Sequence, residues 1–228
     1  MKLSSRLQCI ANLVEKCETV ADIGTDHAYL PIYLIKNSTS QKVIASDLRN
    51  GPAQKAQKNI KKSGLEDAIE VRVGDGLEVI EPMEAQTIII AGMGETLITK
   101  ILKNGQNIAK ACQTLILQPM THHFELRAWL KNNNYSIINE DLCEEEGRIH
   151  LVLKVNCEVK NQDSMNTYFG TILFEKKHPL LADYIHKHIK EYEDVRNELS
   201  RVNSSKAPQK LKEFEERMEL FHKFLNQI

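Results

Sequence analysis

Residues 20–34 read VADIGTDHAYLPIYL, and this stretch decides the fold class. It opens as a buried strand does, with apolar residues around a single acid, Asp22. Gly24 follows, then a polar cluster that contains Asp26 and His27, and then the apolar residues resume. Two acids and a histidine thus lie at the junction of two hydrophobic elements, a position that suggests a ligand site.

The strand in this stretch is the first of five with the same character. The others are expected at residues 42–47, 69–74, 87–92 and 113–119, and the first at 19–24. Each is short and rich in β-branched residues, and helix-like stretches separate them. This alternation predicts an α/β fold with a parallel sheet that is covered on both faces.

The chain beyond residue 134 departs from this alternation. Residues 135–156 contain two strands with only a short acidic turn near Gly147 between them. Such a pair predicts a hairpin, so the last strand runs antiparallel to its neighbour. Five parallel strands that end in a hairpin resemble the Rossmann-like seven-strand sheet of class I methyltransferases more than the sheets of doubly wound dehydrogenases.

Residues 176–228 have a different pattern again. Apolar residues recur at spacings of 4 and 3 from Leu181 to Val202 and, after NSSKAP, from Leu211 to Ile228. This pattern predicts two antiparallel helices that form a coiled-coil hairpin. We therefore expect a catalytic domain at 1–160 and a helical hairpin at 161–228. The hairpin is neutral, with 11 basic and 11 acidic residues, and could be a packing element only.

The composition is that of an ordinary water-soluble protein. The 228 residues are 42% hydrophobic and 27% charged, with a formal net charge of −1. No apolar run reaches the roughly 20 residues that span a bilayer, and no signal peptide is recognisable, so we expect a cytoplasmic protein without membrane contact. The five cysteines lack the spacing of zinc ligands, so no metal is expected.

The residues at the strand ends indicate which ligand to expect. In an open parallel sheet, ligands bind beyond the carboxyl ends of the strands. The second strand ends at Asp47, and an acid there accepts hydrogen bonds from the ribose hydroxyls of an adenosine-containing ligand. Asp75, after the third strand, can accept from an adenine amino group. Gly92, after the fourth strand, keeps its loop thin, so that a transferable group can meet its acceptor.

The glycine pattern narrows the choice of adenosine ligand. Gly24 stands alone, without the G-x-G-x-x-G of a dinucleotide site or a phosphate-binding P-loop. S-adenosylmethionine, which carries adenosine but no phosphate, fits better. Either Asp22 or Asp26 could meet its ammonium group. We expect the cofactor to be held by Asp22, Gly24, Asp47, Leu48, Gly74, Asp75, Gly76, Ala91, Gly92 and Met93.

Five stretches of the sequence together resemble the motifs of one particular protein family. The stretches VADIGTDHAYLPIYL, ASDLRNGPAQKA, VRVGDGLEVI, IIIAGMGETLITKIL and LILQPMTHHFELRAWL resemble successive motifs of the bacterial tRNA (adenine(22)-N(1))-methyltransferase family, TrmK. The resemblance runs from about Leu3 to Lys154, and the terminal helices resemble that family's coiled-coil domain. The family usually reads A-G-M-G-G, where this chain has Glu95 at the last position. Glu95 either faces the acceptor pocket or is a favourable acid at a helix N-terminus.

The resemblance implies methyl transfer from S-adenosylmethionine to N1 of an adenine in the D-loop region of tRNA, with tRNA as the partner. N1 lies on the Watson–Crick edge, so the base must be unpaired or turned out of its stack. Asp26 is our candidate to stabilise the cationic product, with His27 orienting it or the cofactor. Two alternatives stay open: a methyltransferase for a small metabolite, and a non-catalytic binding protein on the same scaffold.

Overall fold

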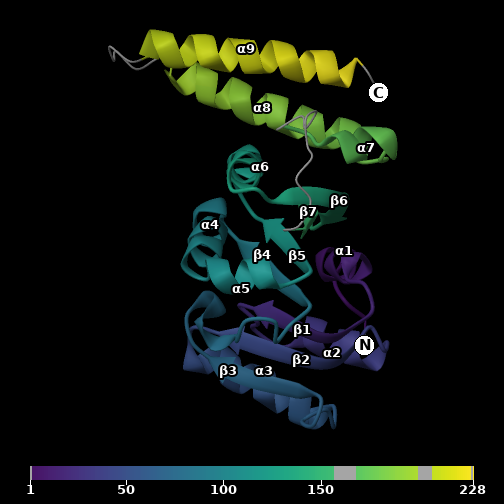
Figure 1. Ribbon diagram of the computed structural model, residues 1–228. Helices are drawn as coiled ribbons and strands as arrows, with labels where there is room; N and C mark the ends of the chain where they lie inside the picture. The colour runs from purple at the N-terminus through teal and green to yellow at the C-terminus, as the bar shows by residue number, and fades with distance from the viewer. Residues whose placement is uncertain (1, 157–167, 200–206, 227) are drawn as a thin grey trace. The chain divides into compact units, whose positions relative to one another are not determined.

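The structure is a computed structural model that describes residues 2–156, 168–199, 207–226 and 228 (Figure 1). It divides into two compact units, Met1–Gly170 and Thr171–Ile228. The boundary that we expected near residue 160 lies in segment 157–167, outside the described residues.

The first unit is built on one seven-stranded sheet in the order β3-β2-β1-β4-β5-β7-β6. Its strands are β1 (Cys17–Ile23), β2 (Ser40–Asp47), β3 (Ile69–Val73), β4 (Thr87–Met93), β5 (Thr114–Pro119), β6 (Ser136–Glu145) and β7 (Arg148–Asn156). Strands β1 to β5 pair in parallel. Strand β7 lies between β5 and β6 and is antiparallel to both, which confirms the predicted terminal hairpin.

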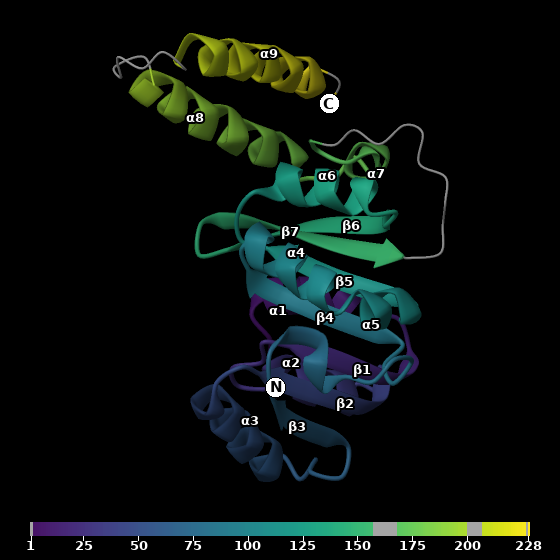
Figure 2. The ribbon, with the colours of Figure 1, turned by 60° about the vertical axis from the view of Figure 1, so that its left-hand side comes forward.

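Helices form a layer on each face of this sheet (Figures 1 and 2). Helices α1 (Ser5–Leu13), α2 (Tyr29–Lys36) and α3 (Asn50–Lys62) pack beside one another in one layer, and α4 (Glu95–Asn104), α5 (Gln106–Ala111) and α6 (His123–Asn132) form the other. A short 3-10 helix, η1 (Gly76–Val79), follows β3. Because both faces are covered, the middle parts of the central strands are buried, for example at Ile88–Ile90 and Leu115–Leu117.

The strand order places the topological switch point between β1 and β4. The chain steps from β1 outward to β2 and β3 and then returns to the other side of β1 with β4. The register brings the ends of these strands level, since Ile23 lies beside Ser46 on β2 and beside Ile90 on β4. A ligand crevice is therefore expected above β1 and β4, at their carboxyl ends.

The second unit is helical, with α7 (Thr171–Glu175), α8 (Leu181–Leu199) and α9 (Ala207–Leu225). Helices α8 and α9 lie side by side and antiparallel (Figures 1 and 2). The Tyr192 ring contacts the rings of Phe214 and Phe221, with centroid distances of 4.9 and 5.2 Å. The predicted helical hairpin is thus confirmed, whereas its supercoiling stays a prediction. Val202 of the predicted seam lies outside the described residues.

Candidate active site

The loop after β1 is held against the end of β2. The backbone N–H groups of Gly24 and Thr25 both donate to the Ser46 carbonyl oxygen, at 2.8 and 2.7 Å. Gly24 has φ of +85°, a conformation that favours glycine, whereas a Cβ there would meet only the flexible end of the Met93 side chain. The loop therefore turns close to the sheet and leaves residues 25–28 beside the switch point.

Asp22 is the buried acid of this loop. Asp22 lies near the carboxyl end of β1 and is only 7% exposed. Burial disfavours the carboxylate and raises its pKa to about 6, although a hydrogen bond from the Thr25 side chain opposes the shift. A cationic ligand beside Asp22 would stabilise its carboxylate form, because a neighbouring positive charge lowers the pKa of an acid.

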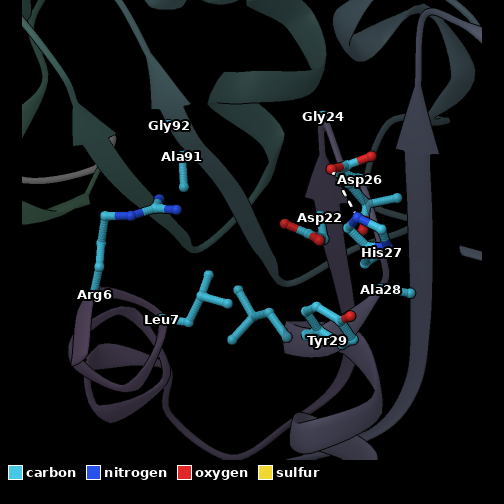
Figure 3. Close-up of a pocket in the computed structure, with 12 residues that line it drawn as sticks. Arg6, Leu7, Asp22, Gly24, Asp26, His27, Ala28, Tyr29, Ala91 and Gly92 are labelled. Atoms are coloured by element: carbon cyan, nitrogen blue, oxygen red, sulfur yellow. Dashed lines mark ion pairs between the residues drawn. The ribbon is translucent and has the colours of Figure 1, made fainter. Parts of the chain in front are cut away.

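The side chains of Asp26 and His27 are in contact, and residues of α3 contact both. His27 Nε2 lies 3.1 Å from Asp26 Oδ2 (Figure 3). Lys55 on α3 places its Nζ 3.8 Å from the other oxygen of Asp26. Asn59, one turn further along α3, donates a hydrogen bond to the backbone oxygen of His27 at 3.1 Å. Helix α3 therefore helps to position both side chains.

Tyr29 extends this unit with a second ring. It is the first residue of α2, and its ring stacks on that of His27 with a centroid distance of 5.2 Å and an interplanar angle of 10°. The residue is 45% exposed. An exposed aromatic face at the edge of a polar site is a surface on which another planar group can stack.

On the other side of the switch point, one side chain holds the carboxyl end of β4. Gln118, on β5, is fully buried, and its Oε1 accepts hydrogen bonds from Gly92 N and from Arg6 Nη1, each at 3.0 Å. Gly92 has φ of +73°, a conformation that favours glycine, and it lies at a bulge between β4 and β5. Arg6 on α1 is itself anchored by Glu145.

These elements enclose a first cavity of about 300 Å³, which we call the His27 cavity. Figure 3 shows Arg6 and Leu7 of α1 on one side of it and His27 and Tyr29 on the other. Its lining includes Asp22, Gly24, Asp26, Ala91 and Gly92. The cavity thus combines two carboxylates, one guanidinium and two stacked rings.

A second cavity of about 350 Å³, which we call the Asp47 cavity, lies at the ends of β1 to β4. It shares Gly24, Ala91 and Gly92 with the His27 cavity. Asp47 is 9% exposed, and its Oδ1 accepts a hydrogen bond from the Arg49 backbone N–H at 2.8 Å. No hydrogen bond to its Oδ2 is found within residues 2–156. Exposed apolar side chains, Leu48 and Leu97, border the same cavity.

All twelve site residues expected from the sequence line one of these two cavities. Asp22, Asp26 and His27 line the His27 cavity, and the remainder line the Asp47 cavity or both: Gly24, Asp47, Leu48, Gly74, Asp75, Gly76, Ala91, Gly92 and Met93. Their roles in binding and catalysis stay predictions.

The sequence reasoning missed Arg6, Tyr29 and Gln118. Arg6 and Gln118 lie far in sequence from the loop that they hold, so only the fold brings them there. Tyr29 lay inside the quoted stretch, and its place directly after His27-Ala28 could have drawn attention to it. Glu95 lies outside both cavity linings, and its carboxylate accepts hydrogen bonds from Thr96 and Thr99 in its own helix, as an acid in a first helical turn does.

The described residues contain neither a metal-binding cluster nor a membrane-spanning helix. Among the described residues, no group of three or more His, Cys, Asp or Glu side chains is arranged to hold a metal ion. Within the same residues, no helix combines the length and apolarity needed to cross a bilayer.

The seven-stranded sheet and the paired cavities at its switch point define a Rossmann-like methyltransferase domain. Residues 3–153 accordingly match the family model described as "Methyltransferase domain". The tRNA (adenine(22)-N(1))-methyltransferase of Bacillus subtilis is 36% identical over 99% of this chain and 98% of its own length. This chain belongs to the tRNA (adenine(22)-N(1))-methyltransferase family, TrmK.

Solved structures of similar proteins have the same architecture over nearly the whole chain. The crystal structure of the Bacillus subtilis M1A22 tRNA methyltransferase TrmK has a TM-score of 0.87 at 35% identity and covers 98% of this chain and 99% of that one. A Streptococcus pneumoniae structure in complex with S-adenosyl-L-methionine has a TM-score of 0.86 at 29% identity, with coverage of 98% and 100%. The comparison thus includes both units of the fold.

Proposed function

We propose that this protein transfers the methyl group of S-adenosylmethionine to N1 of adenine 22 in tRNA. The observation that carries the proposal is the junction of the two cavities at Gly24, Ala91 and Gly92. A methyl donor in one cavity and an acceptor base in the other would meet at this junction, where small side chains leave room for direct contact. Membership of the tRNA (adenine(22)-N(1))-methyltransferase family supports the choice of acceptor.

The Asp47 cavity suits the adenosine part of the cofactor. The free oxygen of Asp47 would accept from the ribose hydroxyls, as acids at this strand end do in Rossmann-like sites. Leu48 and Leu97 would cover the faces of the adenine, and Asp75 would accept from its amino group. The methionyl part would extend past Gly24 towards Asp22, whose buried carboxylate favours a cation.

The His27 cavity suits the acceptor base. In the reaction the N1 lone pair attacks the methyl carbon in line, the C–S bond breaks, and its electron pair goes to sulfur. S-adenosylhomocysteine leaves and the methylated adenine carries a positive charge. No proton needs to move in this step. Positioning and electrostatics therefore supply most of the rate enhancement.

Asp26 would stabilise the positive charge that develops on the base. It lines the cavity, and its two carboxylate oxygens lie next to His27 and Lys55. The Tyr29 ring would stack on the adenine, because a base that leaves its own stack needs a new partner for its face. We assign His27 to orientation of Asp26 and Tyr29, since it contacts both.

We also propose a role for each part of the chain and a location for the protein. The helical part, expected at 161–228, would act as an accessory tRNA-binding domain of the catalytic domain expected at 1–160. A tRNA substrate also favours a cytoplasmic location.

A direct assay tests the proposal. The purified protein is incubated with methyl-labelled S-adenosylmethionine and a tRNA transcript that carries A22, and the nucleosides are then analysed. We expect 1-methyladenosine from this transcript and none from a transcript with G22. Absence of product from the A22 transcript, or equal labelling of a small metabolite pool without RNA, would overturn the assignment.

A further inference from the structure

Helix α3 carries an uneven distribution of charge. Residues 50–62 contain four lysines and no acidic residue, although the whole chain has a net charge of −1. Lys55, Lys58, Lys61 and Lys62 are all exposed. Such a basic face creates a positive local potential on a protein whose net charge is close to zero.

This basic face begins at the candidate active site. Lys55 lies 3.8 Å from Asp26, and Asn59 holds the backbone of His27. Lys58 and Lys62 lie three and seven residues after Lys55, so they share its side of the helix. At 1.5 Å per residue, the row from Lys55 to Lys62 extends about 10 Å away from the catalytic loop.

The other three lysines of α3 form no close ion pair with the residues that the structure describes. Within residues 2–156, the ion pairs include Lys55 but neither Lys58, Lys61 nor Lys62. Lys55 in turn connects the row to Asp26 and so to the cavity. The row is thus continuous with the site and open to an anionic partner.

We propose that the exposed face of α3 docks the phosphodiester backbone of tRNA next to the target adenosine. The inference rests on the proposed function, because a base that enters the His27 cavity brings its flanking phosphates to the rim of that cavity. Lysines act on phosphates as point charges, and each neutralised phosphate releases counterions. This contact adds affinity without reading sequence.

The test neutralises two lysines that lie outside the catalytic machinery. The variant is Lys58→Gln with Lys62→Gln, and the matched control is Lys36→Gln with Lys103→Gln. The control residues are also exposed and lie in the last turns of α2 and α4. Both control residues lie on helices other than α3, and neither lines either cavity. Both variants lose two positive charges.

We expect the α3 variant to bind tRNA about tenfold or more weakly than wild type, with unchanged affinity for S-adenosylmethionine and an unchanged turnover at saturating tRNA. The slope of log affinity against log salt should decrease by about 1.5–2, because two phosphate contacts are lost. The control variant should match wild type in every measurement.

Equal losses in both variants, or an unchanged salt slope in the α3 variant, would overturn the docking surface. So would binding of polyglutamate as tightly as tRNA, since the occupant would then be an acidic protein segment. Failure of the proposed function has a different signature. Wild type would then leave A22 unmethylated, whatever the α3 variant does to tRNA binding.

Discussion

Arg6 and Gly92 are hydrogen-bonded to the same atom. Nη1 of Arg6 and the backbone N of Gly92 each lie 3.0 Å from Oε1 of Gln118. An arginine on the first helix thus shares its acceptor with the loop that separates the two cavities. Gln118 itself is fully buried, and its two part-buried hydrogen bonds tie the end of β4 to α1.

Replacing the shared acceptor should loosen this loop. Gln118→Met is similar in length but removes the acceptor of two part-buried hydrogen bonds, and the one from the charged Arg6 is worth about 1.5–3 kcal/mol. We expect methylation measured as kcat/KM to fall about 10- to 100-fold. Gln113→Met, an exposed position just before the same strand, is the control and should leave activity unchanged. Wild-type kinetics for Gln118→Met would show that the loop does not depend on this contact.

Asp47 should determine cofactor affinity. Asp47→Ala removes the acceptor proposed for the ribose hydroxyls, and charge-assisted hydrogen bonds contribute about 1.5–3 kcal/mol each. Calorimetric titration should show S-adenosylmethionine binding at least about tenfold weaker, with an unchanged far-ultraviolet circular dichroism spectrum. Asp67→Ala, an exposed acid beyond α3, is the control. Equal affinities for wild type and Asp47→Ala would remove Asp47 from the site.

Asp26 should affect turnover more than cofactor binding. If its carboxylate stabilises the cationic product, Asp26→Ala should lower kcat by about 100-fold, as for other preorganised electrostatic groups. Affinity for tRNA should change little. The competing possibility is that Asp26 holds the cofactor ammonium. Lost cofactor binding combined with normal turnover at saturating cofactor would establish that alternative and refute the catalytic role.

Tyr29 should contribute through its ring and not its hydroxyl. Stacking of a base on an aromatic side chain is worth about 1–3 kcal/mol. Tyr29→Leu should therefore lower kcat/KM for tRNA by about 10- to 100-fold, whereas Tyr29→Phe should retain near wild-type values. A tRNA with 2-aminopurine at position 22 provides a direct readout, because stacking quenches its fluorescence. Equal quenching by wild type and Tyr29→Leu would exclude the ring as the platform.

Asp22 should make cofactor binding dependent on pH. Its pKa in the folded protein is about 6, raised by burial from an ordinary value of 3.8. As the pH rises through about 6, the carboxylate forms and attracts the cationic cofactor, so affinity should increase between about pH 5 and pH 7. Asp22→Asn should bind more weakly and flatten this increase. An identical pH profile in the variant would assign the titration to another group.

The same shift predicts the pH dependence of stability without cofactor. Because the folded state binds the Asp22 proton more tightly than the unfolded chain does, this group stabilises the fold at low pH. That contribution is complete below about pH 4 and is lost as the pH rises through about 6. Since a tenfold change in proton affinity is worth about 1.4 kcal/mol, the loss is up to about 3 kcal/mol. Denaturant titrations of wild type and Asp22→Asn at both pH values measure it.

The sequence by itself determined the sheet and the residues at its edge. Short β-branched runs separated by helices allow few arrangements other than a parallel sheet, and the carboxyl ends of such strands meet at one edge. Asp22, Asp47 and Asp75 could therefore be assigned from the sequence to one edge of the sheet, and all three line cavities at that edge. These are local signals, which each depend on a few neighbouring residues.

Only the tertiary structure decided how these residues divide between two cavities and what holds them. Asp22 falls with Asp26 and His27 on one side of Gly24, and Asp47 falls on the other. The support comes from Arg6 and Gln118 and from the α3 residues Lys55 and Asn59. No local sequence pattern predicts such contacts, because they depend on how helices from distant parts of the chain pack around the sheet. Local propensity and periodicity locate the strand ends, whereas long-range packing selects the side chains that position them.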